Sequence, residues 1–198
     1  MPKVNLETLR CAWRRLLGLL LCGPIAAMAA SVLPLDLDAI IDGAATAFHG
    51  TCIETHSERD AQTGLIVTLT TFAVRDQLKG HAPQTHTIKQ LGGRVGDLVS
   101  WVDGIPSFTP GEEYVVFLYG VSTAGFSSPV GLSQGRFAVH GRPSGSVVGN
   151  GRDFREMMPA AAADTPASVR SQADAAPGRL IHMDLDEFKQ LVRRRAAR

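Results

Sequence analysis

Apolar and polar side chains alternate along residues 65–80, and this pattern predicts one long β-strand. β-Branched and aromatic residues, which suit a half-buried pleated surface, are frequent in it. The apolar positions begin on one face, with Val67 and Leu69, and continue on the other face, with Phe72 and Val74. A strand whose apolar face changes in this way must be bulged or bent, so we expect it to serve two sides of a small barrel.

Further short segments have the alternating pattern of strands bounded by turn residues. They are residues 44–57, 85–91, 112–119 and 131–140. No alternation of strands with helices runs through the chain, which favours an antiparallel arrangement. We therefore predict a mainly β fold for residues 30–140, either a small five-stranded antiparallel barrel or an open sandwich.

Two helices are predicted to flank this barrel. Residues 35–42 have apolar side chains at helical spacing, and Asp36 is a suitable N-cap. Residues 182–198 have the pattern of an amphipathic C-terminal helix, in which Asp184 and Glu187 have the spacing of a capping box. We expect this helix to dock on the barrel, and engagement of a separate partner is the alternative.

Two segments differ from the rest in composition. Residues 1–29 combine a basic start, an apolar run and a small-x-small motif, which is typical of a secretory signal peptide. Because the apolar run is shorter than the roughly 20 residues of a spanning helix, we expect export to the periplasm or medium rather than a membrane anchor. Residues 141–181 are rich in alanine, proline and glycine, and a flexible linker is predicted there.

The charge of the chain gives no reason to expect nucleic acid as a partner. The whole chain has a formal net charge of +1 at pH 7. Removal of the basic leader would leave a mature protein of about −2, with no membrane-spanning segment. Cys52 would then be its one cysteine, for which we expect core packing, with a reactive or intermolecular thiol as the alternative.

Several short segments resemble, in their order, a family of exported bacterial proteins with no assigned activity. They are residues 45–52, 66–74, 78–80, 92–96, 110–112 with the following Val-Val-Phe-Leu, and 131–137. This resemblance covers roughly residues 36–140 and implies export and fold. More distantly, the layout is similar to the OB barrel of netrin-type modules and tissue inhibitors of metalloproteases. Those inhibitors use an N-terminal cysteine that a mature chain beginning near Ala30 would lack, so only the barrel is implied.

One motif points to enzyme chemistry. Residues 131–135 match the G-x-S-x-G pattern with Ser133 as nucleophile, and Asp153 and His182 follow in the order of an α/β-hydrolase triad. In those enzymes a strand-to-helix turn raises the serine beside an oxyanion hole. Here a strand is predicted directly after the motif, which favours a glycine-flanked turn. A serine hydrolase is kept as the alternative function.

Metal and cofactor sites have little support in the sequence. His49 and His56 are predicted on opposite faces of one strand, and His81 and His86 flank a proline turn. A zinc site needs three or four convergent ligands, and no further ligand has a suitable spacing. We expect neither a metal nor a cofactor.

The glycine-rich loop, residues 92–110, is the strongest candidate for recognition. It is too apolar for a free linker and carries Arg94, Trp101 and Phe108. Exposed aromatic residues on a rigid scaffold often anchor a partner, whereas burial in the core is the alternative for the same residues. The first hypothesis is an exported, non-enzymatic module that binds a protein or peptide partner in the cell envelope, in the manner of a protease inhibitor or otherwise. A structural envelope-associated role is a third hypothesis.

Overall fold

The computed structural model describes residues 33–143, 145–158, 165–172 and 180–198. From Pro34 onward these residues belong to one compact unit. The signal peptide predicted for residues 1–29 lies outside the described residues. No helix in the described part of the chain is long and apolar enough to cross a membrane.

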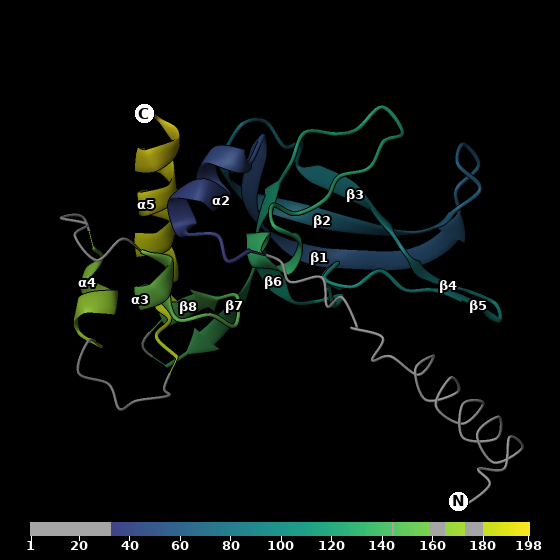
Figure 1. The fold of residues 1–198 in the computed structure, drawn as a ribbon. Coiled ribbons are helices and arrows are strands. Elements are labelled where there is room, and N and C mark those ends of the chain that lie inside the picture. The colour runs from purple at the N-terminus through teal and green to yellow at the C-terminus, as the bar shows by residue number, and fades with distance from the viewer. Residues whose placement is uncertain (1–32, 144, 159–164, 173–179) are drawn as a thin grey trace, which may run out of the picture. The chain divides into compact units, whose positions relative to one another are not determined.

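The described residues form a seven-stranded antiparallel sheet in the order β3-β2-β1-β6-β7-β8-β9 (Figure 1). Its strands are β1 (Thr46–Arg59), β2 (Ile66–Lys79), β3 (Thr85–Leu91), β6 (Glu113–Leu118), β7 (Arg136–Arg142), β8 (Gly145–Gly149) and β9 (Met183–Asp184). A separate hairpin consists of β4 (Gly93–Val95) and β5 (Leu98–Ser100). The mainly β prediction is confirmed. The predicted five-stranded OB-like barrel is not confirmed, because no closed barrel is found among the described strands.

The long strand expected at residues 65–80 is β2. Its own extra residues, Arg75 and Leu78, lie beyond the expected change of face, and opposite Thr71 and Phe72 the extra residue is Ile53 of β1. Its pairing with β1 shifts register at His49/Gly50 and at Cys52/Glu54. At Gly50 the two backbones approach so closely that a Cβ atom would lie 2.7 Å from the Ala73 carbonyl oxygen. These irregularities bend the β1–β2 pair and change which side chains face inward along it.

Helices cover one face of the sheet. They are α2 (Leu37–Gly43), α3 (Phe154–Met157), α4 (Ala167–Arg170) and α5 (Leu185–Ala196), and they gather at the end of the sheet that carries β7 to β9 (Figure 1). The prediction of α2 is confirmed in detail, because Asp36 accepts a hydrogen bond from the Ala39 amide at 2.7 Å through its side chain. Three apolar residues of this helix, Leu37, Ile40 and Ile41, are fully buried.

The central strand β6 separates two cores. Val115 and Phe117 point to the helix-side core, which includes side chains of all these helices. Tyr114 and Val116 point to a second, loop-side core on the opposite face. Cys52 is fully buried in this second core, which confirms the expected core packing, and burial raises the pKa of its thiol.

The segment 141–181 differs from the flexible linker that its composition predicted. Its described residues contribute β8 to the sheet and α3 and α4 to the helix layer. Val148, Phe154 and Met157 are fully buried in the helix-side core. The average composition concealed these few large apolar residues, which supply enough buried surface to order the chain around them.

The C-terminal helix docks on the sheet, as expected. Phe188 of α5 lies at 5.0 Å from the Phe137 ring and 6.1 Å from the Phe117 ring, measured between centroids. Asp184 caps the helix by accepting from the Glu187 amide at 3.1 Å. The reciprocal bond of the predicted capping box is replaced by contacts through Ser168. The Asp184 amide donates to the Ser168 hydroxyl at 3.1 Å, and the Glu187 carboxylate accepts from this hydroxyl at 2.6 Å.

Candidate functional site

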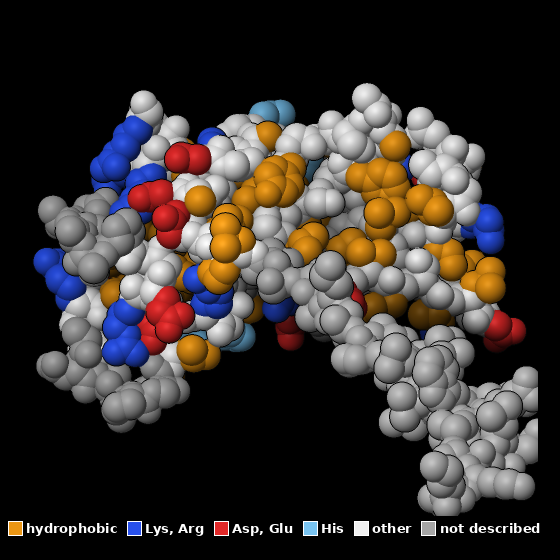
Figure 2. All heavy atoms as spheres, viewed as in Figure 1, with side chains coloured by type: hydrophobic (Ala, Val, Ile, Leu, Met, Phe, Trp, Pro, Cys, Tyr) orange, Lys and Arg blue, Asp and Glu red, His pale blue; other side chains and the backbone are white. Residues whose placement is uncertain are grey.

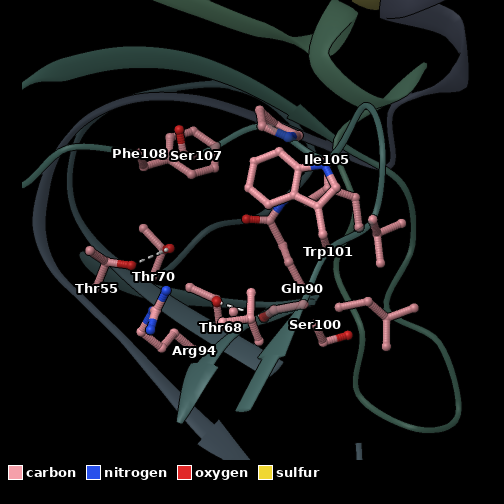
Figure 3. Close-up of a pocket in the computed structure, with 16 residues that line it drawn as sticks. Thr55, Thr68, Thr70, Gln90, Arg94, Ser100, Trp101, Ile105, Ser107 and Phe108 are labelled. Atoms are coloured by element: carbon pink, nitrogen blue, oxygen red, sulfur yellow. Dashed lines mark hydrogen bonds between the residues drawn. The ribbon is translucent and has the colours of Figure 1, made fainter. Parts of the chain in front are cut away.

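A pocket of about 440 Å³ lies between the β1–β3 part of the sheet and the glycine-rich loop (Figure 3). Three strands contribute Thr55, Thr68, Thr70, Gln90 and Leu91 to its lining. The loop contributes Gly92, Gly93, Arg94, Val99, Ser100, Trp101, Val102, Ile105, Pro106, Ser107 and Phe108. The pocket is therefore formed by the same loop that the sequence indicated for recognition.

Two glycines bring the chain from β3 across the face of the β1–β2 pair. The Gly92 carbonyl accepts a hydrogen bond from the Thr68 hydroxyl at 2.8 Å. Gly93 has φ of 136°, and a Cβ atom there would lie 2.3 Å from the Ser57 hydroxyl oxygen. Glycine is the one residue type that both adopts this backbone conformation readily and has no Cβ atom to clash here. The glycine pair thus positions the loop above the pocket.

The floor of the pocket continues the face of the loop-side core. Along β2 this face passes from Phe72 to Thr70 and Thr68, and along β3 it passes from Ile88 to Gln90. On β1 the irregularity after Cys52 brings Thr55 onto the same face, where its hydroxyl lies 3.3 Å from that of Thr70. The face therefore changes from apolar in the core to polar beneath the loop.

Gln90 is the unusual residue of this floor. It is 3 % exposed, and its Nε2 atom has no hydrogen-bond partner among the described residues. A buried donor that is left unpaired costs about 1–3 kcal/mol. In Figure 3 the Gln90 side chain lies between Trp101 and the pair formed by Thr55 and Thr70. Its amide group thus faces the pocket with unused hydrogen-bonding capacity.

Arg94 supplies the charge of the pocket. It is the single charged side chain among the described residues that line it. Arg94 is exposed, and within the described part of the chain its guanidinium has neither an ion-pair nor a hydrogen-bond partner. An exposed guanidinium with five free N–H donors is available for an anionic group of a ligand.

The two aromatic residues of the loop have different positions. Trp101 is 81 % exposed, and its Nε1 donates to Asp103 Oδ1 at 2.9 Å. Phe108 is 5 % exposed and packs edge-to-face against Phe72 and Tyr114, with centroid distances of 5.0 Å and 5.1 Å. Phe108 therefore belongs to the loop-side core, where it anchors the loop, and Trp101 remains as the exposed aromatic contact.

The candidate triad residues have separate surroundings. Ser133 is exposed on a 3₁₀ turn, η1 (Leu132–Gly135), that leads into β7 and not into a helix. Asp153 caps α3 and accepts from the Arg155 guanidinium at 2.6 Å, which lowers the pKa of its carboxyl group. His182 Nδ1 lies 3.5 Å from Arg142 Nη2.

The histidines have varied surroundings, and the rings of His140 and His182 lie 6.4 Å apart between centroids. His49 is buried and donates to Glu113 at 3.1 Å, and burial lowers the pKa of its imidazole despite the carboxylate. His56 is exposed beside Glu54, at 3.6 Å. No group of three or more histidine, cysteine, aspartate or glutamate side chains suited to a metal occurs in the described part of the chain.

Sequence reasoning identified the loop but missed the floor beneath it. The sequence contained a signal for this floor. Thr68 and Thr70 lie four and two residues before Phe72, and Gln90 lies two residues after Ile88, so all three share the inward face of their strands. The chain matches no protein-family model, no curated protein and no solved structure. The function is therefore inferred from the geometry of this pocket and loop.

Proposed function

We propose that the chain is an exported, non-enzymatic binding module that recognises a protein or peptide partner through the glycine-rich loop and the adjoining strand edges. The observation that carries this proposal is a group of exposed apolar side chains on the loop. Leu98 and Val99 are each 55 % exposed, and Trp101 is 81 % exposed. Such a group on a positioned loop is a common feature of protein-binding surfaces.

The exposed group is continuous with other apolar surface. Figure 2 shows hydrophobic side chains gathered over the part of the sheet where β4 and β5 lie, at the right of the view. Val102 lies in the same loop and is also exposed. Burial of this surface against a partner would remove apolar area from water, which favours association.

The loop is fixed at its C-terminal end. Besides the packing of Phe108, the Thr109 amide donates to the Tyr114 hydroxyl at 3.1 Å, and this hydroxyl donates to Glu112 at 2.6 Å. A loop fixed in this way loses less conformational freedom when a partner binds.

Unpaired strand edges adjoin the loop. β6 pairs with β1 only as far as Thr51, so no described strand pairs with residues 53–59 of β1 on that side. β3 is itself an edge of the sheet, where the Ser127 amide donates to the Lys89 carbonyl at 2.9 Å. Extended peptides bind at such edges by adding a strand to the sheet.

Two parts of this proposal rest on the sequence alone. Export depends on the leader in residues 1–29, and an OB-like barrel with inhibitor-like use depends on the distant resemblance to netrin-type modules. Action by binding rather than catalysis is supported by the separate surroundings of Ser133 and Asp153. Labelling with a fluorophosphonate that disappears in Ser133→Ala would contradict this last part.

Selection from a displayed peptide library tests the binding function. We expect the full chain to select peptides, and the double variant Val99→Ser, Trp101→Ala to bind them at least about tenfold more weakly. Val121→Ser is the matched control, because Val121 is 66 % exposed and does not line the pocket. Equal dissociation constants for wild type and the double variant, measured by fluorescence polarisation, would contradict recognition by the loop.

A further inference from the structure

Building on the proposed binding function, we propose that the pocket beneath the glycine-rich loop binds the C-terminal end of a peptide whose last side chain is apolar. Three features of the pocket carry this inference: an unpaired buried amide, one free cation and an apolar wall. Together they match a carbonyl oxygen, a terminal carboxylate and an apolar side chain that lie within one residue of each other.

The buried amide requires a hydrogen-bond acceptor. Gln90 Nε2 has no partner among the described residues, although the side chain is almost completely buried and lines the pocket. The neighbouring hydroxyls are already engaged, Thr55 with Thr70 and Thr68 with Gly92. An acceptor that enters the pocket would satisfy the donor that folding leaves unpaired.

The charge in the pocket selects an anion. Arg94 has no partner in the described chain, and no acidic residue is among the pocket-lining residues. The nearby acids of the loop lie outside this lining: Asp97 is exposed in the β4–β5 turn, and Asp103 accepts from the Trp101 indole. A carboxylate matches the planar guanidinium with two parallel hydrogen bonds.

The loop side of the pocket lining is largely apolar. Val102 and Ile105 of the loop, together with Trp101 and Phe108, contribute the apolar wall. Figure 3 shows Trp101 and Ile105 on one side of Gln90, with Arg94 toward the threonine pair on the other side. A volume of about 440 Å³ is within the range of pockets that hold small ligands. One large apolar side chain with its backbone would fit such a space.

The three features favour a chain end over an internal segment. An internal apolar residue offers a carbonyl to Gln90 but no anion to Arg94. A C-terminal residue offers its carboxylate to Arg94 and the carbonyl oxygen of the preceding peptide bond to Gln90, on either side of the carbon that bears its own side chain. Fatty acids have the same pairing of carboxylate and apolar chain, and peptides with an internal acidic residue also have an anion, so the experiment must separate these ligands.

The test uses fluorescent hexapeptides that end in leucine, each as the free acid and as the C-terminal amide. With the full chain, we expect the amide to bind at least about tenfold more weakly, because it loses the charge-assisted pair with Arg94. Replacement of the last leucine by aspartate should have a similar effect, because a second charge would enter the apolar part of the pocket.

Two variants locate the contacts. Arg94→Gln should bind the free acid about tenfold more weakly and reduce the difference between acid and amide. Gln90→Met removes the donor and should weaken both forms about threefold to tenfold. Because Nε2 is unpaired in the free protein, Gln90→Met should unfold at the same or a higher urea concentration than wild type, so weaker binding cannot be attributed to unfolding.

The control for charge is Arg59→Gln, at the end of β1, since Arg59 does not line the pocket. It should leave both dissociation constants unchanged. Peptides that bind equally as acid and amide, or that require an internal acidic residue, would overturn the C-terminal inference and leave the binding function intact. Binding of octanoate with no binding of any peptide would overturn both proposals, as would the absence of any bound ligand.

Discussion

Single side chains decide how the loop and pocket are built. Gly93 allows the chain to pass over the Ser57 hydroxyl, and Phe108 holds the loop to the aromatic core. Gln90 has the opposite effect on stability, because its unpaired Nε2 costs free energy in the absence of a ligand. Functional sites often contain such locally unfavourable residues, which other contacts compensate.

Asp60 shows how one carboxylate connects the β1–β2 turn to β3. It follows β1 directly and accepts hydrogen bonds from Lys89 Nζ on β3, at 2.8 Å, and from the Thr63 hydroxyl in the β1–β2 turn, at 2.7 Å. The bond from Lys89 is the main cause that lowers the pKa of Asp60 to about 2. A carboxyl group whose pKa is lowered by folding stabilises the folded state above its unfolded pKa, near 3.9.

We therefore predict that Asp60→Asn has a lower free energy of unfolding than wild type at pH 5 to 7. The difference should decrease as the pH falls from about 4 to about 2, because wild-type Asp60 then becomes protonated. Urea unfolding at several pH values measures it. Asp97→Asn is the control, since Asp97 is exposed and has no described partner. A constant difference across the whole pH range would contradict the assignment.

At the scale of elements, α5 closes the helix-side core. Its apolar stripe of Leu185, Phe188, Leu191 and Val192 is buried against the sheet. Lys189 also forms an ion pair with Asp76 of β2 at 3.2 Å, and Arg195 contacts Asp38 of α2. The helix thus joins the last residues of the chain to two of its first elements.

Phe188→Ala should lower the free energy of unfolding by about 3–5 kcal/mol, because it removes a fully buried ring and leaves a cavity. The lost ring contacts include Phe137 at 5.0 Å and Phe154 at 5.8 Å. Arg194→Ala, at an exposed position of the same helix, is the control and should change the stability by less than about 0.5 kcal/mol. Equal urea midpoints for the two variants would contradict docking of α5.

At the scale of the whole compact unit, the sheet has two differently supported ends. Helices cover β7 to β9 and, through α5, the C-terminal part of β2, whereas the β4–β5 hairpin lies away from them and carries exposed Leu98 and Val99 (Figure 1). The central strand β6 is buried on both faces. The recognition loop is therefore separated from the helix layer by the sheet itself.

Hydrogen exchange should show this difference directly. Amides of β6 should exchange most slowly, because strand pairs and two cores protect them, and amides of β4 and β5 most rapidly. A peptide bound in the pocket should slow exchange in β4 and β5 and leave α5 unchanged. Protection of the free hairpin equal to that of β6 would contradict this distribution of stability.

Much of the local structure was predictable from the chain itself. The N-cap at Asp36, the five predicted strands in their approximate places and the amphipathic stripe around Phe188 all follow from short-range patterns. The structure of the described residues between 141 and 181 was not predictable, because it depends on a few buried residues such as Phe154, which average composition does not show. The predicted closed barrel is not found among the described strands. Which strands become neighbours depends on contacts between segments that are far apart in sequence, and local patterns do not show these contacts.

The amino-acid pattern alone therefore established a mainly β chain with a helix at each end of the described unit and a glycine-rich loop of unusual apolar content, since these depend on neighbours in sequence. Only the tertiary structure separated Phe108, an anchor in the core, from Trp101, an exposed contact. It also brought Gln90 and Arg94 into one pocket. Burial and unpaired donors are properties of a packed three-dimensional arrangement, and no local pattern contains them.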